Sequence, residues 1–480
     1  MKKVKRIFAL LLVAMMVFSL AACSKEETPS KDANTTDDAN VSDSEDSKSD
    51  ADSTKDADAS KGEKVQITYS IWGTAEEEAT TQQVADQFNT SQDKIEVKIR
   101  AIPNENYATV MNTMATAKEL PDCGMVREDM VIPWTINGML ADISSMYDGA
   151  ASKPLANTAY TYGGKTVAYA VANENLVLYY NKDMFDAAGV AYPPASIENA
   201  WTWDQFLDAA KKLTIDSNGK HPGEDGFNPD SITQYGCMVE NFTWQLEQFC
   251  LSNGGGFYNE DGSEVAIGND ASIEAIQKVA DLYLKEHVAP LSVGMTDDGC
   301  GRSIIAGTVA MTTNGTWNVG TSLNAAKEDG LNYGIAAIPY MKNKVILSTS
   351  GANAVFSQSK HQAEAMEWVK WYSQEENGWS LISSGIWMPL LESWYTDESL
   401  THKWVDNPNF PPYEEYKAAV VDNAMSPYVK HASWFYTNNT TDFNTLLSST
   451  LGEVWTGQIT AKDAITENLD NLKAAHVGDN

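Results

Sequence analysis

The stretch that decides the fold covers residues 163–214 and reads GGKTVAYAVANENLVLYYNKDMFDAAGVAYPPASIENAWTWDQFLDAAKKLT. Its first half predicts two strands, at 167–171 and 176–180, because both runs are rich in β-branched and aromatic residues. The polar residues 172–175 separate these two apolar runs. A buried strand with such an interruption suggests that the chain crosses here from one structural unit to another.

The second half of the stretch predicts two helices. The first covers 182–188 and is stopped by Gly189, a residue that favours the left-handed conformation of a helix C-terminus. After a proline turn, Thr202 and Gln205 form a capping box that opens the second helix. The apolar face of that helix is formed by Phe206, Ala209, Ala210 and Leu213.

The chain before this stretch alternates strands and helices. Strands are expected at 65–72, 94–102 and 123–126, with helices between them that end near 88 and 118. A βαβαβ order predicts a parallel sheet in an α/β domain. Ligands of open α/β sheets bind beyond the carboxyl ends of the strands, which here carry Trp72, the pair 103–104 and residues 127–129.

The chain after it predicts a second set of α/β elements. Helices are expected near 240–252, 271–286 and 361–373, and a further helix is capped by Thr460 and Asp463. Strands are expected at 234–239 and 307–313. Residues 347–356 are interpreted as a return crossing to the first unit.

Residues 1–22 are predicted to be a lipoprotein signal peptide. Basic residues precede an apolar run over 7–20, which is too short to span a bilayer comfortably. The run ends in Leu-Ala-Ala-Cys, a sequence that resembles a bacterial lipobox, in which the cysteine carries acyl lipid such as palmitate. We therefore expect Cys23 to anchor the chain to the membrane. An ordinary secretory signal followed by a chance cysteine is the alternative.

Residues 23–63 are predicted to be an acidic disordered tether. The part over 24–62 contains twelve acidic residues and five lysines among Ser, Thr, Asn and Ala. Such a composition cannot bury enough apolar surface to form a core. An acidic tail that recruits a partner is the alternative reading of this segment.

Size, charge and cysteine content limit the remaining possibilities. The 480-residue chain carries a net charge of −32, which argues against nucleic acid or acidic lipid as a partner. The part after the tether is too long for one core, so at least two domains are expected. Four cysteines show neither CxxC spacing nor a neighbouring histidine cluster, so we expect buried free thiols and no metal site. They are Cys123, Cys237, Cys250 and Cys300, and a bridge from Cys237 to Cys250 remains open.

Three segments together resemble the family 1 extracellular solute-binding proteins, the sugar receptors of ABC importers. They are the stretch at 163–214, the sequence IAGTVAMTTNGTW at 305–317, and residues 348–389. The resemblance implies the type II fold of periplasmic binding proteins, in which two α/β lobes enclose a ligand cleft and the chain crosses between them repeatedly. Lobe 1 would comprise 64–173 with 350–390, and lobe 2 would comprise 174–349 with 391–480.

The same resemblance selects candidate ligand residues, since the family includes maltose-binding protein. Asp129 and Glu174 fall on sugar-binding carboxylates, and Trp317 falls on a stacking tryptophan. Asn241, Phe242 and Trp244 lie in a segment that is one residue shorter here, and Trp72 ends a strand on the cleft side. Helix-terminal, hinge and core-packing roles are the alternatives for these residues. The family's basic ligand residue after the first strand is not matched.

The function implied is that of a lipid-anchored receptor, on the extracytoplasmic face of the membrane, that delivers a carbohydrate to ABC permease subunits. The protein would be a monomer, would perform no chemistry and would need no cofactor. A receptor for a non-sugar solute and a sensor subunit are alternatives within the same fold. A glycoside hydrolase, which needs two carboxylates, is the enzymatic alternative.

Overall fold

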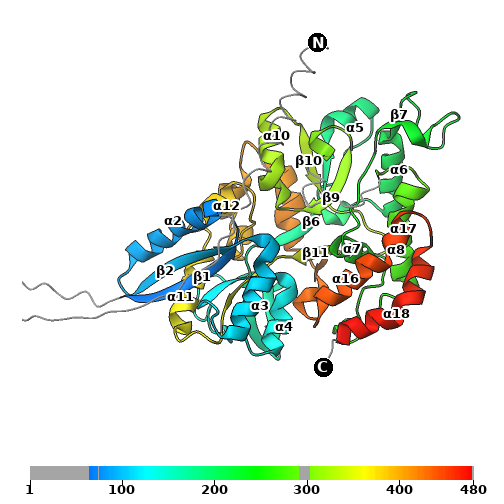
Figure 1. Cartoon of the computed structure of the whole chain (residues 1–480). Helices are drawn as coiled ribbons and strands as arrows, with labels where there is room; N and C mark the ends of the chain where they lie inside the picture. Colours follow the sequence, from blue (N-terminus) through cyan, green and yellow to red (C-terminus); the bar gives the residue numbers. More distant parts are fainter. Residues whose placement is uncertain (1–63, 74, 291–302, 478–480) are drawn as a thin grey trace, which may run out of the picture. The chain divides into compact units, whose positions relative to one another are not determined.

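Two β-sheets organise the part of the chain that the computed structural model describes, residues 64–73, 75–290 and 303–477 (Figure 1). These residues belong to one compact unit, Lys61–Asn480. The predicted signal peptide, the tether, Cys23 and Cys300 lie outside the described residues.

The first sheet has six strands and begins with the predicted parallel pairs. β1 pairs in parallel with β2 along its whole length, from Val65 opposite Ile95 to Trp72 opposite Ile102, and pairs with β3 on its other side. The predicted βαβαβ order is therefore confirmed. In spatial order the strands are β2 (Ile95–Ile102), β1 (Val65–Trp72), β3 (Cys123–Val126), β12 (Ala352–Val355), β5 (Lys165–Ala170) and β4 (Ala159–Tyr162).

The second sheet is built around one long strand. β6 (Glu174–Asn181) is buried over nearly its whole length and pairs antiparallel with three other strands. Those strands are β9 (Met311–Gly315), β10 (Tyr333–Ala336) and β11 (Ile346–Thr349). β13 (Val429–His431) extends the sheet beside β11, and β7 (Ile215–Asp216) with β8 (Ile232–Gln234) forms a separate small ribbon.

The chain passes between the two sheets at the places where the sequence predicts crossings. β5 lies in the first sheet and β6 in the second, so residues 171–173, with the sequence Val-Ala-Asn, connect the sheets. In the opposite direction, β11 lies in the second sheet and β12 in the first. The polar interruption at 172–175 therefore marks a change of sheet. Its last two residues, 174 and 175, already belong to β6.

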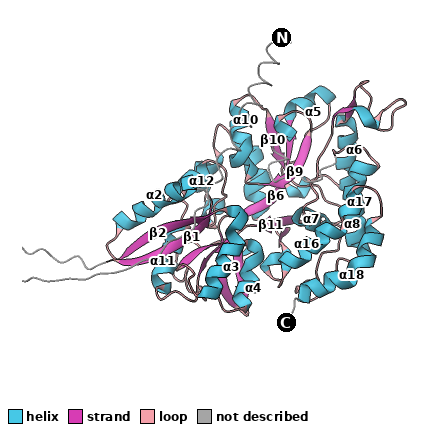
Figure 2. Ribbon diagram, viewed as in Figure 1, coloured by secondary structure: helices cyan, strands magenta, loops and turns pink. Residues whose placement is uncertain are grey.

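Helices cover both sheets, as Figure 2 shows. The longer ones are α2 (Ala75–Ser91), α3 (Tyr107–Ala117), α4 (Glu128–Ile136), α6 (Trp203–Leu213), α7 (Thr243–Ser252), α8 (Asp270–Leu284), α11 (Gln362–Tyr372), α14 (Glu398–Val405), α16 (Thr440–Thr450) and α18 (Ala461–Val477). The shorter ones are α5 (Lys182–Ala188), α10 (Asn324–Glu328), α12 (Trp379–Ser383), α13 (Ser393–Thr396), α15 (Tyr413–Tyr416) and α17 (Gly452–Trp455). Short 3₁₀ or π turns complete the chain, among them η8 (Ser433–Phe435) just before α16.

The predicted helix ends are confirmed at α5 and α6. Gly189 ends α5 with φ of 62°, and the Asn181 side chain accepts a hydrogen bond from Met184 N at the start of that helix. Thr202 and Gln205 form both halves of the capping box of α6. These bonds satisfy backbone N–H groups that the first helical turn leaves without partners.

Two strand predictions are wrong in position. The strand expected at 307–313 begins only at Met311, because Thr308 N and Val309 N both bond back to Ser303 O and close the preceding helical turn. The strand expected at 234–239 is reduced to β8 and isolated bridges. There the backbone passes so close to α6 that a Cβ atom on Gly236 would lie 1.9 Å from the Ala210 carbonyl oxygen.

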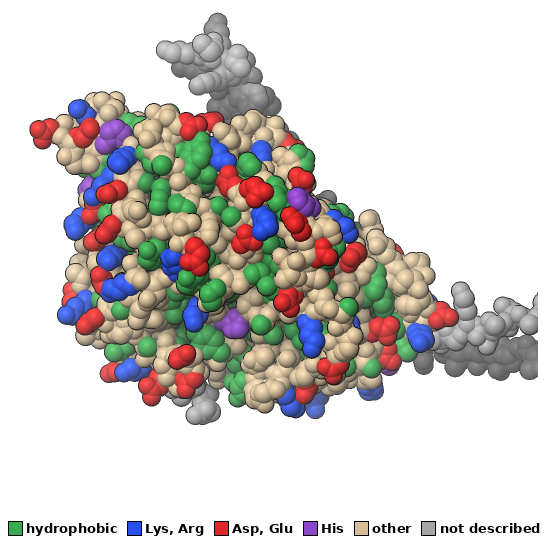
Figure 3. Space-filling model, turned by 180° about the vertical axis from the view of Figure 1, so that it is seen from behind, with side chains coloured by type: hydrophobic (Ala, Val, Ile, Leu, Met, Phe, Trp, Pro, Cys, Tyr) green, Lys and Arg blue, Asp and Glu red, His purple; other side chains and the backbone are tan. Residues whose placement is uncertain are grey.

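The cores of the sheets are apolar and tightly filled, with Trp368, Trp404 and Tyr69 among the largest fully buried side chains. Cys123, Cys237 and Cys250 are buried and free, so Cys237 and Cys250 do not form the bridge that the sequence left open. On the face seen in Figure 3, acidic and basic side chains are interspersed. None of the helices in the described part of the chain combines the length and hydrophobicity that crossing a membrane requires.

Candidate ligand-binding site

A pocket of about 630 Å³ lies among four helical segments from distant parts of the chain. These segments are the beginning of α4, the beginning of α7, η8 and one face of α16. We call this pocket the cleft pocket. It is lined by Arg127, Glu128, Asp129, Phe242, Thr243, Trp244, Trp434, Thr441, Asn444, Thr445 and Ser448.

Asp129 joins two of the segments that line the pocket, α4 and α16. It lies in the first turn of α4, where the helix dipole stabilises a carboxylate. Its Oδ2 accepts a hydrogen bond of 2.8 Å from Thr441 Oγ1 on α16. Asp129 therefore lines the pocket from a helix terminus, which fits both the expected ligand role and the helix-terminal alternative.

Arg127 and Asp129 leave hydrogen-bonding capacity unused in the cleft pocket. Arg127 Nε lies 3.5 Å from Asp129 Oδ1, too far for a good hydrogen bond. Both atoms are buried and have no hydrogen-bond partner among the described residues. Because the Arg127 side chain is 39% exposed, it can move aside and admit a ligand group.

An aromatic wall lines the same pocket as these polar groups. The rings of Phe242 and Trp244 are nearly parallel, at 7°, with centroids 6.0 Å apart. Trp317 meets Trp244 edge to face, with centroids 5.7 Å apart. The wall therefore offers flat apolar area beside the carboxylate, and it includes three of the predicted ligand residues.

Trp317 owes its position to a glycine. Its ring covers Gly315 so closely that a Cβ atom there would lie 1.9 Å from the ring. The Trp317 side chain is partly exposed but does not itself line the cleft pocket. It therefore reaches the site through Trp244.

Glu174 lies near Glu128 but does not line the cleft pocket. It is the first residue of β6 and is partly buried. Burial, followed by the negative charge of Glu128, raises the pKa of Glu174 to about 8. At neutral pH this carboxyl group is therefore largely protonated and able to donate a hydrogen bond.

Tyr160 lies near the same acidic side chains. It is fully buried, donates a 2.6 Å hydrogen bond to Ser350 O, and stacks on Phe435 at 3.9 Å. Burial, followed by the charges of the acidic side chains around it, raises the pKa of Tyr160 well above its usual range. Those side chains are Glu128, Glu174 and Asp129.

Two further predicted residues lie away from the cleft pocket lining. Trp72 packs edge to face on Tyr107, with centroids 5.6 Å apart, and its ring covers Gly351. These contacts favour the packing role for Trp72. Asn241 is partly buried beside Phe242 but does not line the pocket.

Sequence reasoning missed one complete wall of the cleft pocket. Trp434 and four polar residues of α16, namely Thr441, Asn444, Thr445 and Ser448, line it without having been selected. The only signal in the sequence is their spacing, which places uncharged polar groups on one helical face opposite the buried Phe443 and Leu447.

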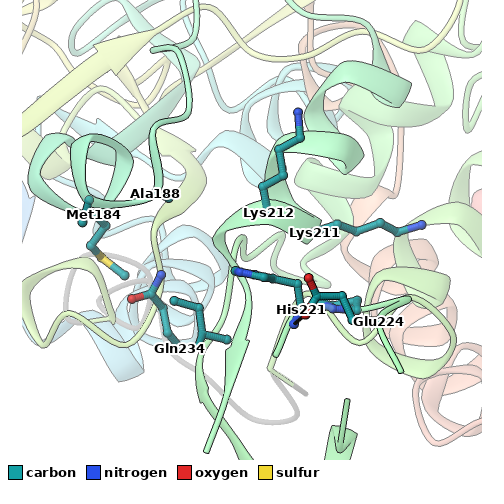
Figure 4. Close-up of a pocket in the computed structure, with 10 residues that line it drawn as sticks. Met184, Ala188, Lys211, Lys212, His221, Glu224 and Gln234 are labelled. Carbon is teal, nitrogen blue, oxygen red and sulfur yellow. Dashed lines mark hydrogen bonds between the residues drawn. The ribbon is translucent and has the colours of Figure 1, made fainter. Parts of the chain in front are cut away.

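A second pocket, of about 510 Å³, lies at the ends of α5 and α6 (Figure 4). Several of its polar groups already have partners within the chain. Lys211 pairs with Glu286 at 2.5 Å, and His221 Nδ1 lies 2.8 Å from Thr214 O. This pocket therefore offers less unused hydrogen-bonding capacity than the cleft pocket. No cluster of His, Cys, Asp and Glu suited to a metal ion occurs within the described ranges.

Comparison with known proteins identifies the family. The model of the bacterial extracellular solute-binding proteins matches residues 83–412, more than half of the chain. The chain therefore belongs to that family, as the sequence resemblance implies.

Curated relatives are distant. A probable ABC transporter-binding protein of Deinococcus radiodurans is 23% identical, over 63% of this chain and 71% of its own length. A maltooligosaccharide ABC transporter solute-binding lipoprotein of Streptococcus pneumoniae is 28% identical, over 52% of this chain and 54% of its own. The match therefore spans only about half of the pneumococcal protein.

Solved structures share the fold. The GacH receptor of Streptomyces glaucescens, studied unliganded and with acarbose, superimposes with a TM-score of 0.68 at 18% identity, over 87% of this chain and all of that one. A substrate-binding protein of Listeria monocytogenes in complex with cycloalternan gives 0.67 at 20% identity, over 85% and 98%. The predicted fold, that of the two-lobed periplasmic binding proteins, is confirmed.

Proposed function

We propose that the protein captures a carbohydrate, in particular an oligosaccharide, and delivers it to the permease of an ABC transporter. The observation that carries the proposal is the composition of the cleft pocket, in which a carboxylate and a guanidinium share one cavity with two nearly parallel aromatic rings. Sugars present hydroxyl groups at their rims and apolar C–H faces, and this pocket has a partner for each.

Two buried atoms without a hydrogen-bond partner, Arg127 Nε and Asp129 Oδ1, also support a carbohydrate ligand. Arg127 Nε is a donor, whereas Asp129 Oδ1 is an acceptor. A hydroxyl group both accepts and donates, so one sugar hydroxyl between them satisfies both atoms. A phosphate group fits less well, because two acidic side chains, Glu128 and Asp129, line the same pocket.

The family relationship supports a binding protein over a hydrolase. The pneumococcal relative is described as a maltooligosaccharide receptor, and the Listeria protein holds cycloalternan. Both are binding proteins. An acidic pair alone is no sign of hydrolysis in a chain with 66 acidic residues, because some pairs must lie close.

The proposal includes a hinge motion between two lobes, with 64–173 and 350–390 in lobe 1 and 174–349 and 391–480 in lobe 2. Asp129 on α4 and Thr441 on α16 would then belong to different lobes, and their hydrogen bond would cross the cleft. A sugar shifts such a protein toward its closed form only by the difference between its affinities for the two forms.

We further propose that the chain acts as a lipid-anchored monomer outside the cytoplasm, held through Cys23 and the acidic tether. The sequence over 20–23 and the composition of 24–62 support this. Two or more acyl chains give stable anchoring where a single chain does not. No cofactor is needed for capture and release.

Calorimetric titration with a panel of linear glucose oligomers tests the function. Asp129→Asn keeps the shape of the side chain but removes its charge, so we expect affinity to fall roughly tenfold to a hundredfold. The matched control is Asp442→Asn, since Asp442 is exposed on α16 outside the pocket lining. It should bind like the parent protein.

Three outcomes would count against this proposal. If the parent protein binds no sugar of the panel, the carbohydrate assignment is wrong. Unchanged affinity in Asp129→Asn would place the site elsewhere. A loss of affinity accompanied by a large drop in melting temperature would show that Asp129 matters for the fold of α4 instead.

A further inference from the structure

We propose that Glu247, a buried acid outside the lining of the cleft pocket, is a positioning residue that holds η8 against α7 and so fixes Trp434 relative to Trp244. This inference rests on the proposed function and adds a residue that acts on ligand affinity without touching the ligand. The argument depends on the hydrogen bonds of Glu247, on the elements that they join and on the burial of its carboxyl group.

The carboxyl group of Glu247 bonds to a single residue of η8. Ser433 N donates to Glu247 Oε1 at 3.0 Å, and Ser433 Oγ donates to Glu247 Oε2 at 3.1 Å. The two residues lie 186 positions apart in the chain, and each is 1% exposed. A pair of buried bonds therefore joins two distant segments at one point.

Each end of this contact lies next to a tryptophan that lines the cleft pocket. Trp434 directly follows Ser433 in η8. Trp244 precedes Glu247 by three residues on α7, and residues three positions apart are neighbours on the surface of a helix. The bonds to Ser433 therefore determine where Trp434 lies relative to Trp244.

η8 depends on such outside contacts for its position. It is a single turn of three residues, Ser433–Phe435, and so short a turn has few hydrogen bonds of its own. On the side of the first sheet, Phe435 stacks on Tyr160 with ring centroids 3.9 Å apart. The bonds from Glu247 hold the same turn from the side of α7.

α7 is a firm support for this contact because its other buried polar side chains fix it to the second sheet. Thr313 Oγ1 on β9 donates to Gln245 Oε1 at 2.6 Å. Gln248 Nε2 donates to Val345 O at 2.8 Å, and Leu347 N on β11 donates to Gln248 Oε1 at 2.7 Å. The carboxyl group between these two glutamines therefore extends a rigid element toward η8.

The carboxyl group gives the fold geometry more than stability. Burial raises the pKa of Glu247 to about 7, although the two bonds from Ser433 act in the opposite direction. No basic side chain among the described residues forms an ion pair with it. A buried acid without a basic partner is expensive to ionise. Its hydrogen bonds are directional, however, so they define the place of Ser433 closely.

Calorimetric titration of the full protein with maltotriose, beside a melting curve for each variant, tests this inference. Glu247→Leu removes both acceptors and lets η8 shift, so we expect affinity to fall roughly threefold to tenfold, as for the loss of part of an aromatic contact. Glu247→Gln should bind like the parent protein. Its amide oxygen can accept from Ser433 N, and its amide nitrogen can donate to Ser433 Oγ.

A double-mutant cycle separates positioning from a general loss of stability. Trp434→Leu should weaken binding, and adding Glu247→Leu to it should cause no further loss, because the carboxyl group acts through Trp434. Should Glu247→Leu not fold, Ser433→Ala takes its place in the cycle. That variant removes one of the two bonds and should weaken binding by a smaller factor.

Asn253→Leu is the matched control. Asn253 ends α7, is equally buried, and donates to Ala271 O on α8 at 2.7 Å, away from the cleft pocket. This variant should lower the melting temperature without changing the affinity for maltotriose.

Several outcomes would overturn the inference while the carbohydrate function stands. They are unchanged affinity in Glu247→Leu or in Trp434→Leu, additive losses in the double variant, and equal losses of affinity in Glu247→Leu and Asn253→Leu. A loss in Glu247→Gln as large as that in Glu247→Leu would also contradict positioning through hydrogen bonds. If the parent protein binds none of the linear glucose oligomers, the proposed function fails and this inference fails with it.

Discussion

Individual carboxyl groups show how burial changes the chemistry of a residue. Burial raises the pKa of Glu174 to about 8 and the pKa values of Glu247 and Glu375 to about 7. Each group is costly to ionise, yet Glu247 and Glu375 both accept backbone hydrogen bonds. The molecule therefore contains acids whose protonation changes near neutral pH.

The raised pKa of Glu174 predicts a dependence of stability on pH. Below about pH 4.3 the carboxyl group is protonated in both the folded and the unfolded state. Between that value and about pH 8 only the unfolded state releases its proton, so the free energy of unfolding falls as pH rises. Above about pH 8 both states are ionised and this contribution no longer changes.

Glu174→Gln should remove the whole contribution of Glu174 to that slope, which is most easily separated between pH 7 and 8, where Glu247 and Glu375 contribute less. We expect the variant to exceed the parent in unfolding free energy at pH 8 by roughly 1 to 3 kcal/mol, since each pKa unit corresponds to about 1.4 kcal/mol. Urea titrations at pH 5, 7 and 8 measure this, with the exposed Glu467→Gln as control. Parallel curves for Glu174→Gln and the parent would contradict the assignment.

Single elements differ in how fully the sequence determines them. The capping box at Thr202 and the stop at Gly189 are local signals, so the bounds of α5 and α6 could be predicted closely. Capping is a property of a few adjacent residues, and nothing elsewhere in the chain competes with it.

The capping box of α6 supplies the prediction at this scale. Thr202→Ala removes a side-chain acceptor for Gln205 N, which should cost about 1 kcal/mol, in a range of roughly 0.5 to 2. Hydrogen exchange at the first turn of α6 should speed up, whereas the buried strand β6 should exchange as in the parent. Thr202→Ser, which keeps the hydroxyl, is the control. Equal exchange in all three proteins would show that the cap contributes nothing.

Elements that depend on distant contacts could be predicted less well. The start of β9 shifted because backbone bonds to Ser303 use the first residues of the expected strand. Among the residues that the family resemblance selects, Asp129, Phe242 and Trp244 line the cleft pocket. The wall from α16 was missed because periodicity shows which face of a helix is polar but does not show what that face meets.

At the scale of the whole molecule, the two connections between the sheets meet the 389–395 segment in one largely buried hydrogen-bond network. Asn173 Oδ1 accepts a hydrogen bond from Asn157 Nδ2 at 3.0 Å, and Asn173 Nδ2 donates to Tyr395 Oη at 3.0 Å. Asn157 also donates to Ser348 Oγ, and Tyr395 donates to Pro389 O. The network thus joins the 171–173 connection to the end of β11 and to the 389–395 segment.

The position of this network predicts that Asn173 affects the motion of the proposed lobes more than other buried amides do. Asn173→Leu removes the hydrogen bonds of Asn173 to Asn157 and Tyr395, and we expect the free energy of unfolding to fall by about 1 to 3 kcal/mol.

Asn423→Leu is the control, since Asn423 is equally buried and bonds to Ala195 O and Ala419 O, away from the connections. Both variants should lose comparable stability, because both leave buried polar groups unpaired. Only Asn173→Leu should change the decrease in radius of gyration on adding maltotriose, as measured by small-angle X-ray scattering, because only that residue ties the connections together. Equal compaction of both variants would show that the network stabilises the fold without governing its closure.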